Sequence, residues 1–324
     1  MRAKTSLRPL PRNFLAAFVP LGAFLASLSG VLAPQGGAAE PKPVPRVQAI
    51  PLPQDQVSFE CDHRELTRLY CGPGQQRPFL FPINGPSGFS LTRMGHPHDP
   101  ITHSHHNSVW ISHAAVNGLS FWADTSGARI LHKRVEKLTD GDDSASVQTA
   151  SVWRSPDGAD LLEDKRILTI KPLQNGEWLL LIDLQLTPLK DAVQLGDTAF
   201  GMLGVRMAKT IGVKDGGGTI RNSEGGVDEK GCFRKNARWV DYSGPVTNEI
   251  QEGITLFDHP SNPNHPVPFH VRDDGWMGAA LTFGNPITLA PGQTLRLQYG
   301  LYVHSGAPSA ESLEAAWKAF SSAP

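Results

Sequence analysis

The feature that most restricts how this 324-residue chain can fold is a series of strand-like segments separated by short turns. Apolar and polar residues alternate most clearly in WLLLIDLQL at 178–186, within the segment 177–187. Similar segments at 130–138, 145–154 and 160–170 precede it, and Asp-Gly, Pro-Asp-Gly and Asn-Gly turns join the four. Alternation with a period of two, interrupted by frequent turns, predicts neighbouring antiparallel strands.

The rest of the chain continues this pattern. Further strands are predicted at 56–61, 65–71, 77–81, 89–92, 104–113, 203–208, 253–257, 278–283 and 294–303. The single clear helix, at 309–320, carries Leu313, Ala316, Trp317 and Phe320 at helical spacing and should pack on a sheet. We therefore predict an all-β fold, a large antiparallel β-sandwich with a short C-terminal helix. By analogy of pattern it resembles the galactose-mutarotase-like supersandwich, whose concave face binds sugars.

The N-terminal residues predict export. A basic stretch precedes an apolar run at 14–33, and small residues follow at 36–39. This order is typical of a cleaved signal peptide at 1–40, with an uncleaved membrane anchor as the alternative. We expect a periplasmic or secreted protein with no membrane association beyond that segment. A Pro-rich linker at 41–53 should form no sheet ladder, and 54–324 should form a single domain.

Charge and cysteine content narrow the partners and the environment. The chain has 30 Lys and Arg against 31 Asp and Glu, so a surface for nucleic acid is not expected. The expected partner is a small molecule or an oligosaccharide. In an oxidising compartment, Cys61 and Cys71 are close enough in sequence to pair across a hairpin, while Cys232 is expected to be a buried small residue.

Histidines gather in one segment of the chain. Six of the twelve lie between residues 96 and 113, at His96, His98, His103, His105, His106 and His113. Imidazole binds metals and transfers protons near neutral pH, and this segment runs directly into apolar, Trp-rich residues, unlike an ordinary surface loop. In a regular strand at 104–113, His103, His105 and His113 would face the site and His106 the other side, unless a bulge re-aims one of them.

Several short motifs lie between residues 77 and 305. They are RPF at 77–79, His105-His106, VWISH at 109–113, VNG at 116–118, FW at 121–122, NSEG at 222–225, ARWVDYSG at 237–244, FDHPSNP at 257–263 and HVRD at 270–273. Together they resemble the PmoA-like "methane oxygenase" family. The family's Asp and Pro before the histidine pair are replaced here by Thr102 and Ser104. If that Asp orients a histidine in the family, either Asp99 replaces it here or the role is lost. A membrane methane monooxygenase subunit needs several long apolar spans, and this chain has at most one, so methane oxidation is not carried over.

Polar residues in three regions are candidates to meet in one site. They are the histidine segment with Asn117 and Trp122; Asn222, Glu224, Arg238, Asp241 and Tyr242; and Asp258, His259, Asn262, Asn264, His265, His270, Arg272 and Asp274. Ordering such polar loops costs conformational entropy, which favours a functional role for them.

The leading hypothesis is an exported carbohydrate-active enzyme, an isomerase, lyase or hydrolase, acting on a sugar or sugar acid. Glu224 would act as base, with His105, His106 or His270 as acid. The substrate would be bound by Asn117, Trp122, Arg206, Arg238, Asp241, Tyr242, Asn262 and Arg272.

Two alternatives use the same residues differently. In the first, a divalent metal such as Zn, Cu or Fe is bound in an oxidase or hydrolase, either by His103, His105 and His113 or by His105 with Asp258 and His259. In the second, the protein is a glycan-binding module without catalytic activity.

Overall fold

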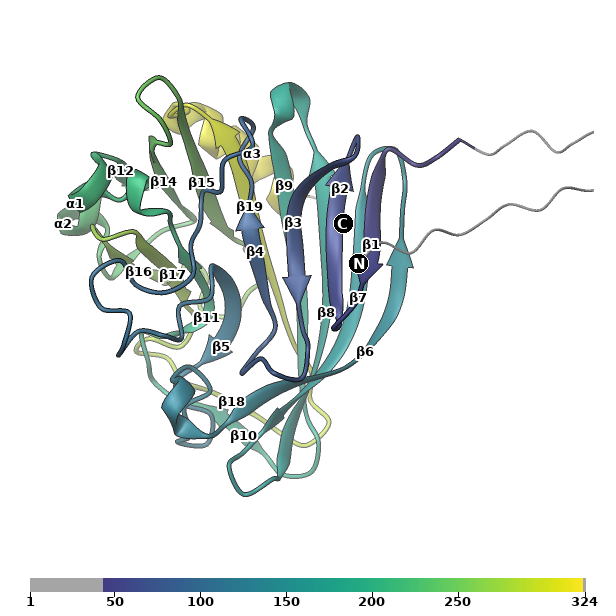
Figure 1. Ribbon diagram of the computed structural model, residues 1–324. Helices are drawn as coiled ribbons and strands as arrows, with labels where there is room; N and C mark the ends of the chain where they lie inside the picture. Colours follow the sequence, from purple (N-terminus) through teal and green to yellow (C-terminus); the bar gives the residue numbers. More distant parts are fainter. Residues whose placement is uncertain (1–42, 323–324) are drawn as a thin grey trace, which may run out of the picture. The chain divides into compact units, whose positions relative to one another are not determined.

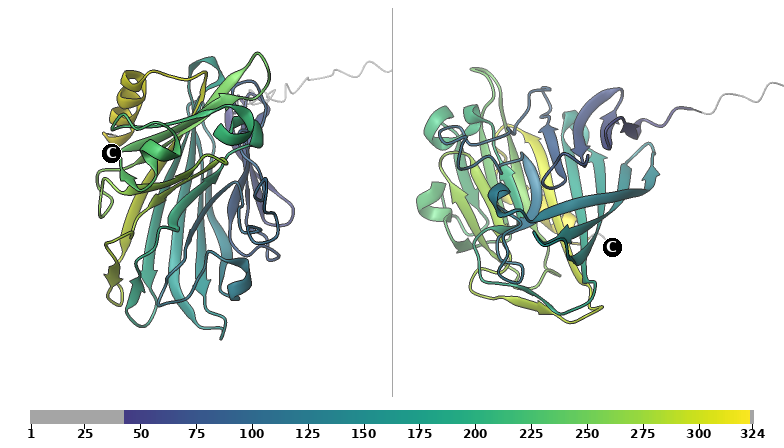
Figure 2. Two further views of the ribbon diagram at one scale, coloured as in Figure 1. Left: turned by 90° about the vertical axis from the view of Figure 1, so that its left-hand side faces the viewer. Right: turned by 60° about the horizontal axis from the view of Figure 1, so that its bottom comes forward.

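The computed structural model describes residues 43–322, which form two large antiparallel sheets packed face to face (Figures 1 and 2). A two-stranded ribbon of β10 (Val193–Leu195) and β18 (Ile287–Leu289) accompanies them. The predicted antiparallel β-sandwich with a short C-terminal helix is confirmed. The targeting segment predicted at 1–40 lies outside the described residues. Within those residues, no helix is long and apolar enough to cross a membrane.

The eight-stranded sheet has the order β12-β14-β15-β19-β9-β8-β7-β6. Its strands are β6 (Arg129–Thr139), β7 (Ala145–Arg154), β8 (Asp160–Pro172), β9 (Trp178–Pro188), β12 (Thr219–Asn222), β14 (Trp239–Pro245), β15 (Gln251–Asp258) and β19 (Leu295–Ser305). The four segments predicted between residues 130 and 187 are β6 to β9, each antiparallel to the next. Every second residue of β9 is buried along its whole length, so the period-two prediction is confirmed there.

The nine-stranded sheet has the order β1-β2-β3-β4-β5-β11-β17-β16-β13. Its strands are β1 (Val47–Leu52), β2 (Gln56–Cys61), β3 (Arg64–Tyr70), β4 (Phe79–Ile83), β5 (Val109–His113), β11 (Gly201–Arg206), β13 (Lys235–Asn236), β16 (Pro268–Arg272) and β17 (Trp276–Ala280). Neighbouring strands β5, β11 and β17 come from three distant parts of the chain, as Figure 1 shows. This sheet therefore brings the histidine segment beside the residues around 206 and 270.

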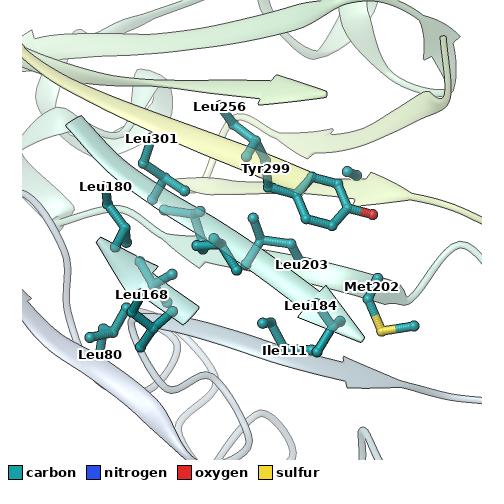
Figure 3. Packing of buried hydrophobic residues seen from close by; sticks show 14 of the residues in the cluster. Leu80, Ile111, Leu168, Leu180, Leu184, Met202, Leu203, Leu256, Tyr299 and Leu301 are labelled. Atoms are coloured by element: carbon teal, nitrogen blue, oxygen red, sulfur yellow. The ribbon is translucent and has the colours of Figure 1, made fainter. Parts of the chain in front are cut away.

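One continuous apolar core fills the space between the sheets (Figure 3). The nine-stranded sheet contributes Leu80, Ile111 and Leu203, which meet side chains of the other sheet such as Leu168 and Leu301. Burial of each such side chain stabilises the fold by roughly 1.5–3 kcal/mol.

A helix covers the outer face of the eight-stranded sheet. α3 (Ala310–Ser321) begins after Ser309, whose hydroxyl accepts a hydrogen bond from the backbone N–H of Ser312. Its Leu313 and Phe320 pack against Trp239 and Phe257 of β14 and β15. The remaining helical segments are short: η1 (Asp124–Ser126), η2 (Gln174–Gly176), η3 (Lys209–Ile211), α1 (Val213–Gly216) and α2 (Asp228–Cys232).

The prediction that residues 41–53 form no ladder is wrong for the second half of that segment. Val47–Leu52 is strand β1, which pairs with β2 along its whole length. β1 is the outermost strand of its sheet, so only one of its edges needs partners. Pro51, which has no N–H to donate, is tolerated in such an edge strand.

Cys61 and Cys71 are free thiols, so the disulfide considered for them is not formed. The β2–β3 hairpin pairs Cys61 with Arg64 beside its turn and Gln56 with Tyr70 at its open end. The two cysteines therefore lie at opposite ends of a six-residue strand, well beyond the Cα separation that a disulfide allows. Cys232, at the end of α2, is buried as predicted.

Candidate functional site

A cavity of about 510 Å³ lies against the nine-stranded sheet. Its walls carry five imidazoles, three guanidinium groups, one carboxylate and four other aromatic rings. These are His96, His103, His105, His106 and His270; Arg206, Arg234 and Arg272; Asp274; and Trp122, Phe200, Phe233 and Trp276. The histidine segment and the residues near 206 and 270 therefore do share one hollow.

Strand alternation determines which side chains reach this cavity. Met277 of β17 joins the core between the sheets, so its neighbour Trp276 faces the opposite side, where it packs in a separate aromatic cluster. In the same way Arg206 of β11 and His270 and Arg272 of β16 line the cavity. The cavity is thus on the outer face of the nine-stranded sheet, away from the eight-stranded sheet and α3.

Two glycines make room for the floor of the cavity. Gly204 of β11 and Gly278 of β17 are directly paired, and Trp110 and His270 continue the same row on the flanking strands. A Cβ atom on Gly204 would lie 2.5 Å from the indole of Trp276, and one on Gly278 would lie 2.9 Å from it. The indole therefore rests directly on the two glycines, between Trp110 and His270.

The histidine segment is not a strand before Val109. Residues 100–105 form turns, and Ser108 has a φ of 61°, so β5 begins only after it. The predicted strand alternation therefore does not apply, and His105 and His106 both line the cavity, with ring centroids 4.6 Å apart. His113, expected to face the site, is instead buried, with its Nε2 2.9 Å from the Thr282 hydroxyl.

The deepest imidazoles are neutral at pH 7. Burial, with a smaller contribution from nearby arginines, lowers the pKa of His105 to about 4 and that of His270 to about 4. Burial also lowers the pKa of His106, whose ring stacks on both Trp110 and Trp276. A neutral imidazole has one N–H and one lone pair, so it can donate or accept a proton.

His96 is held by hydrogen bonds on both ring nitrogens. Its Nδ1 accepts the backbone N–H groups of His98 and Asp99, each at 3.0 Å, so its Nε2 carries the proton and donates to Asp274 at 2.9 Å. The other oxygen of Asp274 accepts Arg206 at 2.9 Å. Burial would raise the pKa of Asp274, but Arg206 and His96 together lower it, so this carboxylate remains charged and paired.

Two arginines bring positive charge to the cavity. The guanidinium groups of Arg234 and Arg272 lie 5.0 and 5.4 Å from the ring centroid of Phe233. Arg272 also contacts Glu229 at 2.9 Å, whereas Arg234 makes no ion pair among the described residues. Since Asp274 is already paired, the lining has an excess of positive charge.

Asp241 and Tyr242, expected to bind substrate, do not line the cavity, but Tyr242 supports the site from beneath. The Tyr242 hydroxyl lies 3.2 and 3.1 Å from the carbonyl oxygens of Arg272 and Asp273, and accepts the N–H of Val213 at 3.1 Å. It therefore fixes the turn that carries Arg272 and Asp274. Asp241 is fully buried within the eight-stranded sheet.

Glu224, expected to be the base, does not line the cavity. Its Oε1 lies 3.1 Å from Nη1 of Arg238, and Arg238 also contacts Glu314 of α3 at 3.3 Å. Because α3 packs on the outer face of the eight-stranded sheet, this ion-pair group is on the other side of the sandwich from His105. The predicted Glu224–imidazole pair across a sugar ring is therefore absent.

Three other candidates fix loops. Asn262 donates to Asp258 and to the carbonyl of Gln298, each at 2.8 Å. The ring of His259 bonds to Ser261 and packs edge-on against Phe320 of α3. Asn117 occupies a turn with a φ of 49° and accepts the N–H of Gln194. None of the three lines the cavity.

The histidines proposed as metal ligands do not converge. His103 and His105 line the cavity with ring centroids 5.6 Å apart, while His113 and His259 lie elsewhere. Within residues 43–322, no three His, Cys, Asp or Glu side chains form a group that could hold a metal ion.

A family model described as "Family of unknown function (DUF6807)" matches residues 56–318. The chain belongs to the DUF6807 family. No curated protein matches its sequence.

The DUF6807 chain is similar to solved structures of low sequence identity. Galactose 1-epimerase from Lactobacillus acidophilus NCFM has 8% identity and a TM-score of 0.40, with 82% of this chain and 100% of that chain covered. An aldose epimerase homologue from C. elegans has 7% identity and a TM-score of 0.32, with coverage of 82% and 100%. Heparan sulfate lyase HepC from Pedobacter heparinus has 10% identity and a TM-score of 0.34, with coverage of 79% and 36%.

Some residues of the DUF6807 site were not predicted from sequence. Arg234, Phe200 and Phe233 come from segments without a recognisable motif, and only strand pairing brings them to the cavity. Arg77, in the RPF motif, is 1% exposed and donates to the carbonyl oxygens of His105 and Trp122. The sequence signal that could have indicated this role of Arg77 is its position directly before an apolar strand.

Proposed function

We propose that the protein binds an acidic sugar in this cavity and acts on it by imidazole acid–base chemistry. The observation that carries the proposal is the combination of an aromatic floor, neutral imidazoles and positive charge in one hollow. Its volume is within the range of about 300–1,000 Å³ typical of small-molecule sites.

The arginines favour a carboxylate-bearing ligand. A guanidinium group can hold a carboxylate with two parallel hydrogen bonds, and such charge-assisted bonds are stronger than neutral ones. Arg234, which has no ion pair among the described residues, is the first candidate for this contact. Arg272 would act beside it while remaining in contact with Glu229.

The aromatic residues favour a sugar ring. Trp122 and Trp276 line the cavity with ring planes at 89° and centroids 5.6 Å apart, which forms an apolar corner. The C–H face of a pyranose packs well on an indole, while its hydroxyl groups can bond to the surrounding imidazoles.

The imidazoles supply proton transfer. Lowered pKa values keep His105 and His270 unprotonated at pH 7, so each is available as a base. In a sugar acid, the carbon next to the carboxylate carries a proton that becomes more acidic when an arginine neutralises that carboxylate. Removal of this proton is the first step of both epimerisation and elimination.

We also propose that the protein acts outside the cytoplasm. The basic, apolar and small-residue order of residues 1–40 supports a cleaved export signal. Cell fractionation combined with N-terminal sequencing of the mature protein tests this. Full-length protein in the cytoplasm would contradict it.

Calorimetry with a matched pair of probes tests the ligand class. Methyl glucuronide and methyl glucoside differ only in their carboxylate, so the glucuronide should bind at least about tenfold more tightly, as expected for one charged hydrogen bond. Arg234→Gln should remove that difference. Arg296→Gln, on β19 of the other sheet, should not. Equal affinity for both probes would contradict the acidic-sugar proposal.

Exchange of protons with solvent tests the chemistry separately. In D2O, the glucuronide proton at the carbon next to the carboxylate should be replaced by deuterium in the presence of the protein, as seen by proton NMR. Binding without exchange would overturn the acid–base part and leave a glycan-binding module.

A further inference from the structure

The five cavity imidazoles differ in which ring nitrogen is free, and two of them are hydrogen-bonded to a carboxylate: His96 to Asp274 and His103 to Asp99. Nδ1 of His103 lies 3.0 Å from Oδ2 of Asp99. We propose that Asp99 fixes His103 in the tautomer protonated at Nδ1, so that its unprotonated Nε2 faces the cavity as the proton acceptor for the bound sugar. Asp99 is then a positioning residue. The catalytic part of this inference rests on the proposed function.

The alternative acceptors are less suitable. His96 has no free lone pair, because its Nδ1 accepts two backbone N–H groups and its Nε2 donates to Asp274. His106 and His270 are both more than nine-tenths buried, and each has a buried Nδ1 without a hydrogen-bond partner among the described residues. Among the described residues, no carboxylate is hydrogen-bonded to either ring nitrogen of His105.

The tautomer of His103 follows from what Asp99 can accept. An ionised carboxylate has no proton to give, and the Thr102 hydroxyl, which also lies 2.9 Å from Nδ1, gives its single proton to Asp99. The proton at Nδ1 therefore belongs to the imidazole. Nε2 lies on the other side of the ring from Nδ1, and the ring is surrounded by His96, His105 and His106 at centroid distances of 4.8, 5.6 and 5.1 Å. All three neighbours line the cavity.

Asp99 is itself held in place. Its Oδ1 accepts the backbone N–H of Thr102 at 3.0 Å, and the Thr102 hydroxyl contacts its Oδ2. These hydrogen bonds lower the pKa of Asp99 to about 2, so the group is a carboxylate at neutral pH. The backbone N–H of Asp99 donates to His96, and His96 in turn joins this pair to the Asp274–Arg206 pair.

The proton balance is complete without another reactant. The C–H bond next to the sugar carboxylate breaks, the proton passes to Nε2 of His103, and the electron pair enters the carboxylate as an enolate. The resulting imidazolium is adjacent to the negative charge of Asp99, and the arginines offset the negative charge of the enolate. The side chains of His103 and Asp99 are 41% and 39% exposed, so the proton can then exchange with water.

Nitrogen NMR of the imidazole tautomers tests the positioning role directly. In 15N-labelled full-length protein, long-range proton–nitrogen correlation spectra should show His103 protonated at Nδ1 at neutral pH. Asp99→Asn keeps the oxygen that accepts the Thr102 N–H, and its amide group can donate to Nδ1. His103 should therefore convert to the Nε2-protonated tautomer in this variant. The control is Asp215→Asn, in α1. It removes the carboxylate that bonds to His98, a histidine on the same loop as His103, and should leave the His103 tautomer unchanged.

A second measurement tests the acceptor role. Saturating methyl glucuronide should shift the Nε2 resonance of His103 more than its Nδ1 resonance. In Asp99→Asn this difference should disappear. A wild-type His103 protonated at Nε2 would overturn the positioning role, whatever the glucuronide does. The predicted tautomer with bound glucuronide and an unchanged Nε2 resonance would overturn the acceptor role. If the glucuronide does not bind, the proposed function fails while the tautomer result still decides the role of Asp99.

Discussion

The indole of Trp276 rests on Gly204, where an added Cβ atom would lie only 2.5 Å from the ring. Gly204→Ala should therefore push the floor of the cavity outward. We expect the unfolding free energy to fall by about 1–3 kcal/mol, as for other overpacked sites. Affinity for methyl glucuronide should fall as well. Denaturant unfolding and calorimetry measure the two effects.

Gly74→Ala is the matched control for this change, because an added Cβ atom there would meet no atom within 4 Å. It should leave both measurements close to wild type. Wild-type stability and affinity in Gly204→Ala would show that the indole can move aside without cost, and that the glycine pair does not define the floor.

The buried carboxylate of Asp241, which is hydrogen-bonded to His304 and ion-paired with Arg221, gives a second prediction. Both side chains are fully buried, and Asp241 accepts His304 and Thr255 at one oxygen and Ser243 and Arg221 at the other. Asp241→Asn leaves several donors without an anionic partner. Breaking such a buried pair should reduce the unfolding free energy by about 3–5 kcal/mol. Chemical denaturation at neutral pH measures this loss.

The same residue predicts the direction of a pH effect. Burial would raise the pKa of Asp241, but the hydrogen bonds of His304, Arg221 and Ser243 lower it overall. A carboxyl group with a lowered folded-state pKa stabilises the fold above its unfolded pKa of about 3.9, and loses that contribution as the pH falls through the folded value. The difference between wild type and Asp241→Asn should therefore shrink on acidification below about pH 4. If the difference in unfolding free energy stayed constant with pH, the loss of stability in Asp241→Asn would come from packing and not from charge.

Local patterns predicted the strands well, where one face is buried and the other is not. β7 begins and ends where it was predicted, since a period-two pattern is a direct consequence of burial on one face, and β2 does so because a polar turn follows it. β1 was missed because proline reads as a breaker, although an edge strand tolerates it. The predicted strand at 89–92 forms only isolated bridges at Ser90 and Thr92, which a local pattern cannot distinguish from a ladder.

The candidate site was predicted in part. His105, His106, His270, Arg206, Arg272 and Trp122 do share one cavity, because β5, β11, β16 and β17 are joined in one sheet. Glu224 and Arg238 do not, although they belong to equally polar motifs. Which face of the sandwich a loop reaches depends on the order of strands within each sheet, and this order is set by contacts between residues far apart in the sequence.

The neutral imidazoles predict a loss of stability in mild acid. The folded-state pKa values of His105 and His270 are about 4, below the unfolded value of about 6.5. Between these values the unfolded chain binds more protons than the folded one, so the unfolding free energy falls as the pH decreases. His105→Gln should reduce the slope in this window. Urea unfolding across it provides the measurement, and an unchanged slope would show that His105 titrates normally in the folded protein.

Arg77 gives the last prediction, because one buried guanidinium group joins the two segments that wall the cavity. Its Nη1 donates to Asn107 at 2.7 Å and its Nη2 to the carbonyl of Trp122 and to Asp124, at 2.8 and 2.7 Å. Arg77→Met keeps most of the volume but leaves Asp124 and two backbone carbonyls without this donor. Breaking the buried pair should reduce the unfolding free energy by about 3–5 kcal/mol.

Hydrogen exchange shows whether this loss is local. In Arg77→Met, amide protection should decrease first in residues 103–108 and 122–126, while β7 to β9 retain theirs, because those strands belong to the eight-stranded sheet and do not line the cavity. Arg154→Met, which removes an exposed ion pair with Asp160, should leave protection of the cavity segments unchanged. If protection instead decreased evenly through both sheets, Arg77 would stabilise the sandwich as a whole, and the cavity walls would need another explanation for their order.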